Sequence, residues 1–346
     1  MKSLWLIAAA LAAGLIAGCG QQSSRQIAST TDQAQTPIAG LENYTLGRPI
    51  TYGNVTVVPI SNKVQEQAAK DFITLAEAKK NNWIEITENP GDEQVDSLQV
   101  KNTGPKPILL MAGDLLLGGK QDRVVARDTI VQVGQTTNVP VYCVEPGRWT
   151  GSSTTFAYDE RQVPASVKEA AIAGNQEEVW SQVGTYNAAV GANGGRTTIA
   201  SGLSEHEVQQ AITASLPKFM ADIKGNENVV GAVFVLNGKI KWFESFATNK
   251  LFNNSIEGIL KGILAEAYAT KSHEKSEFTI EECADFVKKC LSASKTRTDR
   301  QGSGVLNWQV DGDGVRGQEL SITERSPGAD RVRGEQKIHT AMVAGG

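Results

Sequence analysis

The chain has 346 residues, of which 40% are hydrophobic and 21% are charged, and its formal net charge is −4. This composition is ordinary for a globular protein, and the acidic balance argues against a nucleic-acid-binding protein, which needs a basic face to neutralise phosphates. No segment repeats at a fixed period, which argues against a solenoid or a propeller.

Residues 1–18 predict a signal peptide. Lys2 precedes an apolar run from Leu4 to Ala17, which is short for a transmembrane helix and ends in small residues. The stretch Ile16–Cys19 resembles a bacterial lipobox, which implies cleavage before Cys19 and acylation of its thiol, for example by palmitate. An ordinary signal peptide cleaved elsewhere and a single-pass anchor are the alternatives.

Lipidation at Cys19 predicts a protein that is anchored in the membrane of the bacterial cell envelope by its lipid. Gly20 follows the cysteine, where an Asp would resemble an inner-membrane retention signal. In a Gram-negative organism we therefore expect the periplasmic face of the outer membrane. Residues 19–40 are polar and nearly without large apolar side chains, so they predict a flexible tether.

Residues 41–346 predict a single domain of the α+β class, β-rich over 51–150 and mixed helical and hairpin over 151–346. In the first part, Thr74 and Glu77 form a capping box before a short helix. The turn-rich stretch Asn102–Pro105 separates two β-type runs and predicts a hairpin.

The second part predicts amphipathic helices between further strands. Asn175 is an expected helix cap, and Ser204 with Glu207 forms a second capping box before an apolar stripe. Asn237–Gly238, between two apolar runs, is the strongest hairpin signal in the chain. Residues 256–268 then repeat apolar side chains at helical spacing.

Besides Cys19 the chain has Cys143, Cys283 and Cys290. Thr279 and Glu282 predict a capped helix that carries the last two, seven residues and therefore roughly 10 Å apart, which is beyond the reach of a disulfide. We expect both to be core thiols, and Cys143 to be packed in a strand, although a thiolate near Glu145 stays open. No metal site is expected, because the CxxC or His partners that zinc needs are missing nearby.

The stretch from Gly113 to Arg123 contains candidate ligand-binding residues. It is not a phosphate-binding loop, because five residues separate Gly113 from Gly119 and Gln121 stands where a hydroxyl residue is needed. Glycines can still turn backbone amides toward an anion, and polar side chains gather around Gly118 and Gly119. These side chains are Asp114, Lys120, Gln121, Asp122 and Arg123.

A second polar turn closes a predicted strand with Glu145, Arg148 and Trp149. Arginine offers a bidentate cation and tryptophan a stacking face, so the two turns together would form a pocket for a small anionic ligand with a flat ring. The alternative is that both are hairpin turns whose charges pair with each other.

Other chemistry finds little support in the sequence. His206, His273 and His339 lie outside any recognisable Ser or Cys nucleophile motif. The DGDG of Asp311–Gly314 lacks the ligands of an EF-hand at positions 5 and 12, so it predicts a hairpin turn.

The motifs ITLAEAKKNNWIEITE, GDLLLGGKQDR and VPVYCVEPGRW resemble the ADP-ribosylglycohydrolase- and rhodanese-phosphatase-associated protein domain, a family of unknown biochemical activity. The resemblance is specific over Tyr52–Trp149 and looser beyond. Family members usually carry Glu at the position of Asp114 and Asn at that of Asp122. The resemblance implies a link to NAD or ADP-ribose metabolism and names no reaction.

These residues are compatible with three functions. The first is binding of a small anionic, nucleotide- or ADP-ribose-like ligand through Lys120, Gln121, Arg123 and Arg148, with Trp149 stacking. The second is a hydrolase with Asp114 or Glu145 as general base. The third is an envelope module that binds a protein partner. The sequence identifies no cofactor.

Overall fold

The computed structural model describes residues 35–90, 95–147, 153–192, 197–223, 225–270, 277–301, 304–325 and 332–345, without the side chains of 299–301, 324–325, 332 and 333. The signal peptide, Cys19, Arg148 and Trp149 therefore lie outside the described residues. Residues 34–346 form one compact unit. The predicted α+β class is confirmed.

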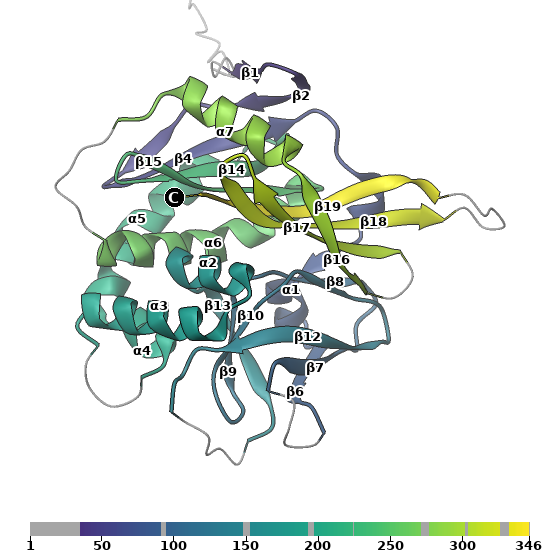
Figure 1. Ribbon diagram of the computed structural model, residues 1–346, viewed down its shortest axis with the longest axis vertical. Coiled ribbons are helices and arrows are strands. Elements are labelled where there is room, and N and C mark those ends of the chain that lie inside the picture. Colours follow the sequence, from purple (N-terminus) through teal and green to yellow (C-terminus); the bar gives the residue numbers. More distant parts are fainter. Residues whose placement is uncertain are drawn as a thin grey trace, which may run out of the picture. The chain divides into compact units, whose positions relative to one another are not determined.

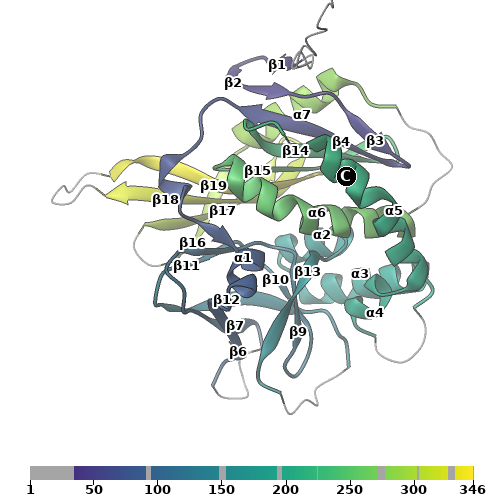
Figure 2. The same ribbon diagram turned by 180° about the vertical axis from the view of Figure 1, so that it is seen from behind.

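A large antiparallel sheet of ten strands organises this unit (Figures 1 and 2), in the order β1-β2-β4-β14-β15-β19-β18-β17-β16 with β3 paired to β4. Its strands are β1 (Thr36–Ile38), β2 (Leu41–Leu46), β3 (Ile50–Tyr52), β4 (Val55–Asn62), β14 (Val229–Leu236), β15 (Lys239–Phe246), β16 (Lys295–Gln301), β17 (Val305–Gly312), β18 (Val315–Arg325) and β19 (Val332–Ala344).

Two smaller sheets contain most of residues 73–162. The six-stranded sheet consists of β13 (Phe156–Gln162), β9 (Asp114–Gly118), β10 (Arg123–Val125), β12 (Thr136–Cys143), β7 (Ser97–Asn102) and β6 (Ile84–Glu88), in that order. The three-stranded sheet consists of β11 (Thr129–Val131), β8 (Ile108–Leu110) and β5 (Ile73–Thr74).

Helices cover both faces of the large sheet (Figures 1 and 2): α7 (Ile280–Ser292) lies on one face, and α5 (His206–Ile223), α6 (Asn249–Ala269) and α2 (Ala165–Ala173) lie on the other. The alternation of buried side chains along the strands explains this, since Val233 and Val235 pack with α7 while Phe234 packs with α6. The remaining helices are α1 (Leu75–Lys80), α3 (Gln176–Ala189), α4 (Ile199–Leu203) and a short 3-10 turn, Gln67–Ala69.

Most local predictions are confirmed. The capping boxes at Thr74 and Thr279 are present, and the Asn175 side chain accepts two backbone N–H groups at the start of α3. The Asn237–Gly238 and Asp311–Gly314 turns join β14 to β15 and β17 to β18. Cys283 and Cys290 are buried, free thiols on the side of α7 that packs in the core.

Two local predictions are wrong. The turn at Asn102–Pro105 does not form a hairpin, because β7 and β8 belong to different sheets. The buried Asn102 amide donates instead to the carbonyl oxygens of Lys106 and Val131, which directs the chain away from β7. Ser204 does not cap α5: it ends α4, and α5 begins at His206.

Within the described residues, no helix combines the length and the apolar character needed to cross a membrane.

Candidate functional site

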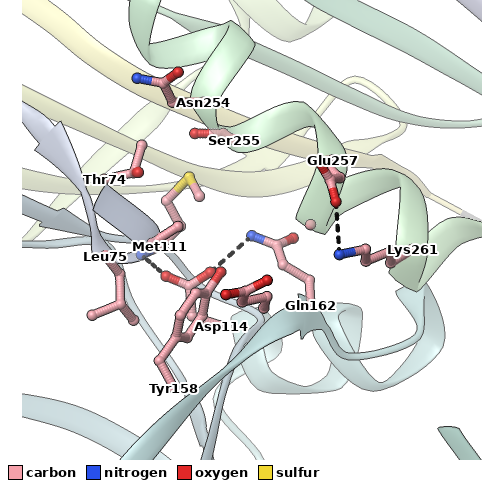
Figure 3. A pocket seen from close by; sticks show the side chains of 13 residues that line it. Thr74, Leu75, Met111, Asp114, Tyr158, Gln162, Asn254, Ser255, Glu257 and Lys261 are labelled. Carbon is pink, nitrogen blue, oxygen red and sulfur yellow. Dashed lines mark hydrogen bonds and ion pairs between the residues drawn. The ribbon is translucent and has the colours of Figure 1, made fainter. Parts of the chain in front are cut away.

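A cavity of about 100 Å³ lies where α1, β9, β13 and α6 meet (Figure 3). Four segments far apart in the chain line it. They contribute Thr74, Leu75 and Ala76; Met111 and Asp114; Tyr158, Glu160 and Gln162; and Asn254, Ser255, Glu257, Gly258 and Lys261.

Asp114 is a fully buried carboxyl group in the wall of this cavity. The chain turns back over residues 111–114, with Gly113 at φ +94°, so that the Met111 N–H donates to Asp114 Oδ2 at 2.8 Å. Gln162 Nε2 donates to Asp114 Oδ1 at 3.2 Å. Burial raises the pKa of Asp114 to about 7, although both hydrogen bonds and the charge of Lys168 lower it in part.

Ser255 presents a hydroxyl group to the same cavity from α6. Its side chain is 4% exposed, and its Oγ has no hydrogen-bond partner in the described part of the chain. A buried hydroxyl without a partner is costly, so this atom is a candidate contact for a ligand.

The cavity is acidic. Glu160 and Glu257 line it together with Asp114, and the one lysine there, Lys261, pairs with Glu257 at 2.8 Å. Burial raises the pKa of the Tyr158 hydroxyl well above its usual value, and the neighbouring carboxylates raise it further. The surroundings therefore disfavour an additional negative charge.

A chain of buried polar groups extends from Asp114 to His339, which the sequence left without a role. Lys168 Nζ donates to Gln162 Oε1 at 3.0 Å and pairs with Glu244, whose other oxygen lies 3.3 Å from His339 Nε2. His339 Nδ1 lies 2.6 Å from Asp128 Oδ2. Burial alone lowers the pKa of His339, but the two carboxylates raise it to about 9, so the imidazole is charged at neutral pH.

Glu244 is the acidic partner of both cations in this chain. Burial tends to raise the pKa of its carboxyl group, but Lys168 and His339 outweigh burial and lower it below the usual range. Among the described residues, no three or more His, Cys, Asp or Glu side chains are placed to hold a metal ion.

The structure brings the two predicted polar turns together. Gln121 Nε2 donates to the Glu145 carbonyl at 2.9 Å, and the Asp122 N–H donates to Glu145 Oε2 at 3.3 Å. Asp122 also accepts from the Gly118 N–H at 3.0 Å and from Thr198 Oγ1 at 2.7 Å. These contacts hold the two turns against each other. Glu145 does not line the Asp114 cavity.

Arg123 lies under these turns and is fully buried. Its Nη1 donates to the Gln121 carbonyl at 2.8 Å, whereas Nε and Nη2 have no hydrogen-bond partner in the described residues. At the same turn the Lys120 backbone N–H donates to Glu88 Oε1 at 2.9 Å. Burial raises the pKa of Cys143, opposite Arg123 on β12, which disfavours a thiolate there.

Sequence reasoning found Asp114 but missed the groups that surround it. Gln162, Lys168, Glu244 and Ser255 stand singly in strands and helices, with no neighbouring motif. The signal that could identify them is a polar residue at a position where the helix or strand period predicts a buried side chain. Lys168, on the buried face of α2, is an example.

A family model described as ARG and Rhodanese-Phosphatase-superfamily-associated Protein domain matches residues 43–336. No match was found among curated proteins or among solved structures.

Proposed function

We propose that this chain, which belongs to the ARG and Rhodanese-Phosphatase-superfamily-associated Protein domain family, is a hydrolase in which Asp114 acts as general base. One observation carries the proposal: the Asp114 carboxyl group lies in a cavity wall and has a pKa of about 7. A general base works best when its pKa lies near the working pH. Glu145, the other candidate base, does not line this cavity.

The size and charge of the cavity favour a class of ligand. A volume of about 100 Å³ has room for roughly three water-sized groups. The carboxylates of Glu160 and Glu257 oppose a free anion and accept hydrogen bonds from hydroxyl groups, while Ser255 and Asn254 add further polar contacts. We therefore expect the part of the substrate that enters the cavity to be uncharged and to carry hydroxyl groups.

In this mechanism the ionised Asp114 accepts a proton from a water molecule while the water oxygen attacks the ligand. The neutral Asp114 then returns that proton to the leaving group, so that one water molecule is added across the broken bond. The bonds from Met111 and Gln162 hold both carboxyl oxygens as acceptors during the first step.

The test is a hydrolysis screen with nitrophenyl glycosides, esters and phosphates. Asp114→Asn should reduce kcat by at least about 100-fold on any substrate that is cleaved. In the wild type kcat/KM should rise with pH through about 7, where Asp114 ionises. Asp285→Asn, an exposed carboxylate on α7, is the matched control. Full activity of Asp114→Asn would refute the proposal.

A second candidate is the binding of a small anionic, nucleotide- or ADP-ribose-like ligand at the 118–123 and 145–149 turns. The observation in its favour is Arg123, whose buried guanidinium group leaves Nε and Nη2 without partners among the described residues. Titration calorimetry with ADP-ribose, NAD and a sugar phosphate tests it, with Lys120→Ala and Arg148→Ala as variants. Heat from the wild type that both variants reduce supports it, and no heat with any of the three contradicts it.

We also propose that the mature protein is tethered to the envelope membrane through an acylated Cys19. The support is the sequence of residues 1–19. In cells fed an alkyne analogue of palmitate, the wild type should be labelled, Cys19→Ala should not, and Cys143→Ala should behave as the wild type. Equal labelling of Cys19→Ala would refute the anchor. Binding of an envelope protein partner has no specific observation in its favour.

A further inference from the structure

The buried polar groups around Asp114 form a ring of hydrogen bonds that the backbone between Met111 and Ala112 completes. From Asp114 the ring runs through Gln162, Lys168, Glu244 and His339 to Asp128. Asp128 Oδ1 accepts the Ala112 N–H at 2.9 Å, and the adjacent Met111 N–H returns to Asp114. Every side chain in the ring is at most 5% exposed.

The direction of each bond in the ring is fixed by its charged members. A lysine ammonium group can only donate, so Gln162 must turn its carbonyl oxygen toward Lys168. The Gln162 amide nitrogen then faces Asp114 Oδ1 and can only donate to it. Both Asp114 oxygens therefore accept a bond from the protein, which favours the ionised carboxylate.

The backbone leaves space for this arrangement. A Cβ atom on Gly113 would lie 2.9 Å from Lys168 Cδ, so the glycine permits the close approach of the lysine stem to the 111–114 turn. Lys168 is held from the other side by Glu244, which His339 contacts in turn. The ammonium group is thus fixed two hydrogen bonds away from Asp114, through Gln162.

We propose that Lys168 is a positioning residue: acting through Gln162, its ammonium group holds the Asp114 carboxyl group as an acceptor and favours its ionised form. The inference rests on the proposed function for its catalytic consequence, but the effect on Asp114 is measured without any substrate. Other charged or titratable groups also face Asp114 or its cavity. They are Asp128, Tyr158, Glu160, Glu257 and Lys261.

The experiment is a carbon-13 NMR titration of the Asp114 side-chain carboxyl group, assigned by loss of its signal in Asp114→Asn. In Lys168→Met the titration midpoint should rise by about one pH unit, because a favourable positive charge is lost. Lys168→Arg keeps the charge and should return the midpoint toward the wild-type value. Lys79→Met, which removes a lysine bonded to the Tyr158 carbonyl outside the ring, should leave the midpoint within about 0.3 pH units.

Lys168→Met leaves Glu244 without its lysine, and the loss of one partner of a buried pair can prevent folding. The double variant Lys168→Met/Glu244→Gln removes both charges of the pair, and a smaller rise is expected because the negative charge of Glu244 is lost as well. A folded variant that lacks the positive charge at position 168, and whose Asp114 midpoint still matches the wild type, overturns the inference.

The two proposals fail separately. If the midpoint moves but Asp114→Asn hydrolyses normally, Lys168 positions Asp114 and the hydrolase proposal is wrong. If Asp114→Asn loses activity while the midpoint stays in place, the hydrolase proposal holds and Lys168 is a structural residue.

Discussion

The imidazole of His339 shows how a single buried residue links stability to pH. It lies between Asp128 and Glu244 with no solvent exposure, and its ring centroid is 4.4 Å from that of Phe246, with the two planes tilted by 33°. Its pKa rises from 6.5 to about 9 on folding, so the folded protein holds this proton more tightly than the unfolded chain. The stabilisation is complete below pH 6.5 and is lost as the pH rises through about 9.

We predict that the free energy of unfolding falls between pH 7 and pH 9 by about 2 kcal/mol. The titration of Asp114, whose pKa is about 7, changes the free energy of unfolding mainly below pH 7. Urea denaturation at several pH values measures the slope. His339→Gln should lose most of it, whereas His206→Gln, on the exposed surface of α5, should keep it. An unchanged slope in His339→Gln would show that another group controls this range.

At the scale of elements, the turn between β8 and β9 connects the local chain to the cavity. Gly113 combines a left-handed φ of +94° with a close approach to Lys168. Gly134, in another turn, has a φ of +70° and nothing within 4 Å of the position of a Cβ atom. Comparing substitutions at these two glycines therefore separates the free-energy cost of backbone strain from the cost of displacing the Lys168 side chain.

Gly113→Ala should therefore destabilise the protein more than Gly134→Ala. We expect Gly134→Ala to cost about 1 kcal/mol, the usual strain of a left-handed alanine, and Gly113→Ala to cost about 3 kcal/mol, because a buried side chain must also move. Urea denaturation of both variants measures the difference. Equal losses would mean that Lys168 adapts freely.

The elements also show what the sequence can and cannot predict. Signals that act within a few residues, such as the Thr74 and Thr279 capping boxes and the Asn237–Gly238 turn, are confirmed. The hairpin predicted at Asn102 is wrong because a bond to Val131, 29 residues away, decides the path of the chain. The partners of Asp114 escape prediction for the same reason, since Gln162 lies 48 residues away and no local pattern marks it.

At the scale of the whole molecule, helix α6 joins the sheets. Its buried side chains pack against β14 on one side, and the backbone of its Gly262 approaches the Val163 carbonyl that follows β13 on the other. The hydrogen-bonded ring connects the same two layers, with Glu244 and His339 in the large sheet and Asp114 and Gln162 in the six-stranded sheet.

We predict that the two layers unfold together. Variants that keep only Trp242, in the large sheet, or only Trp83, which packs with the six-stranded sheet, should give fluorescence transitions in urea with the same midpoint. Circular dichroism at the same urea concentrations should coincide with both. Separate midpoints would mean that the layers are independent folding units.

The buried thiols offer a way to watch such openings without denaturant. Cys143 ends β12, whereas Cys283 and Cys290 lie on the buried side of α7, which covers the other face of the large sheet. Burial raises the pKa of all three, that of Cys283 to about 12, so each reacts slowly with an alkylating reagent while the fold is closed. The alkylation rate of each thiol would therefore report how often the layer that contains it opens. The core thus carries its own reporter groups, and no label has to be introduced.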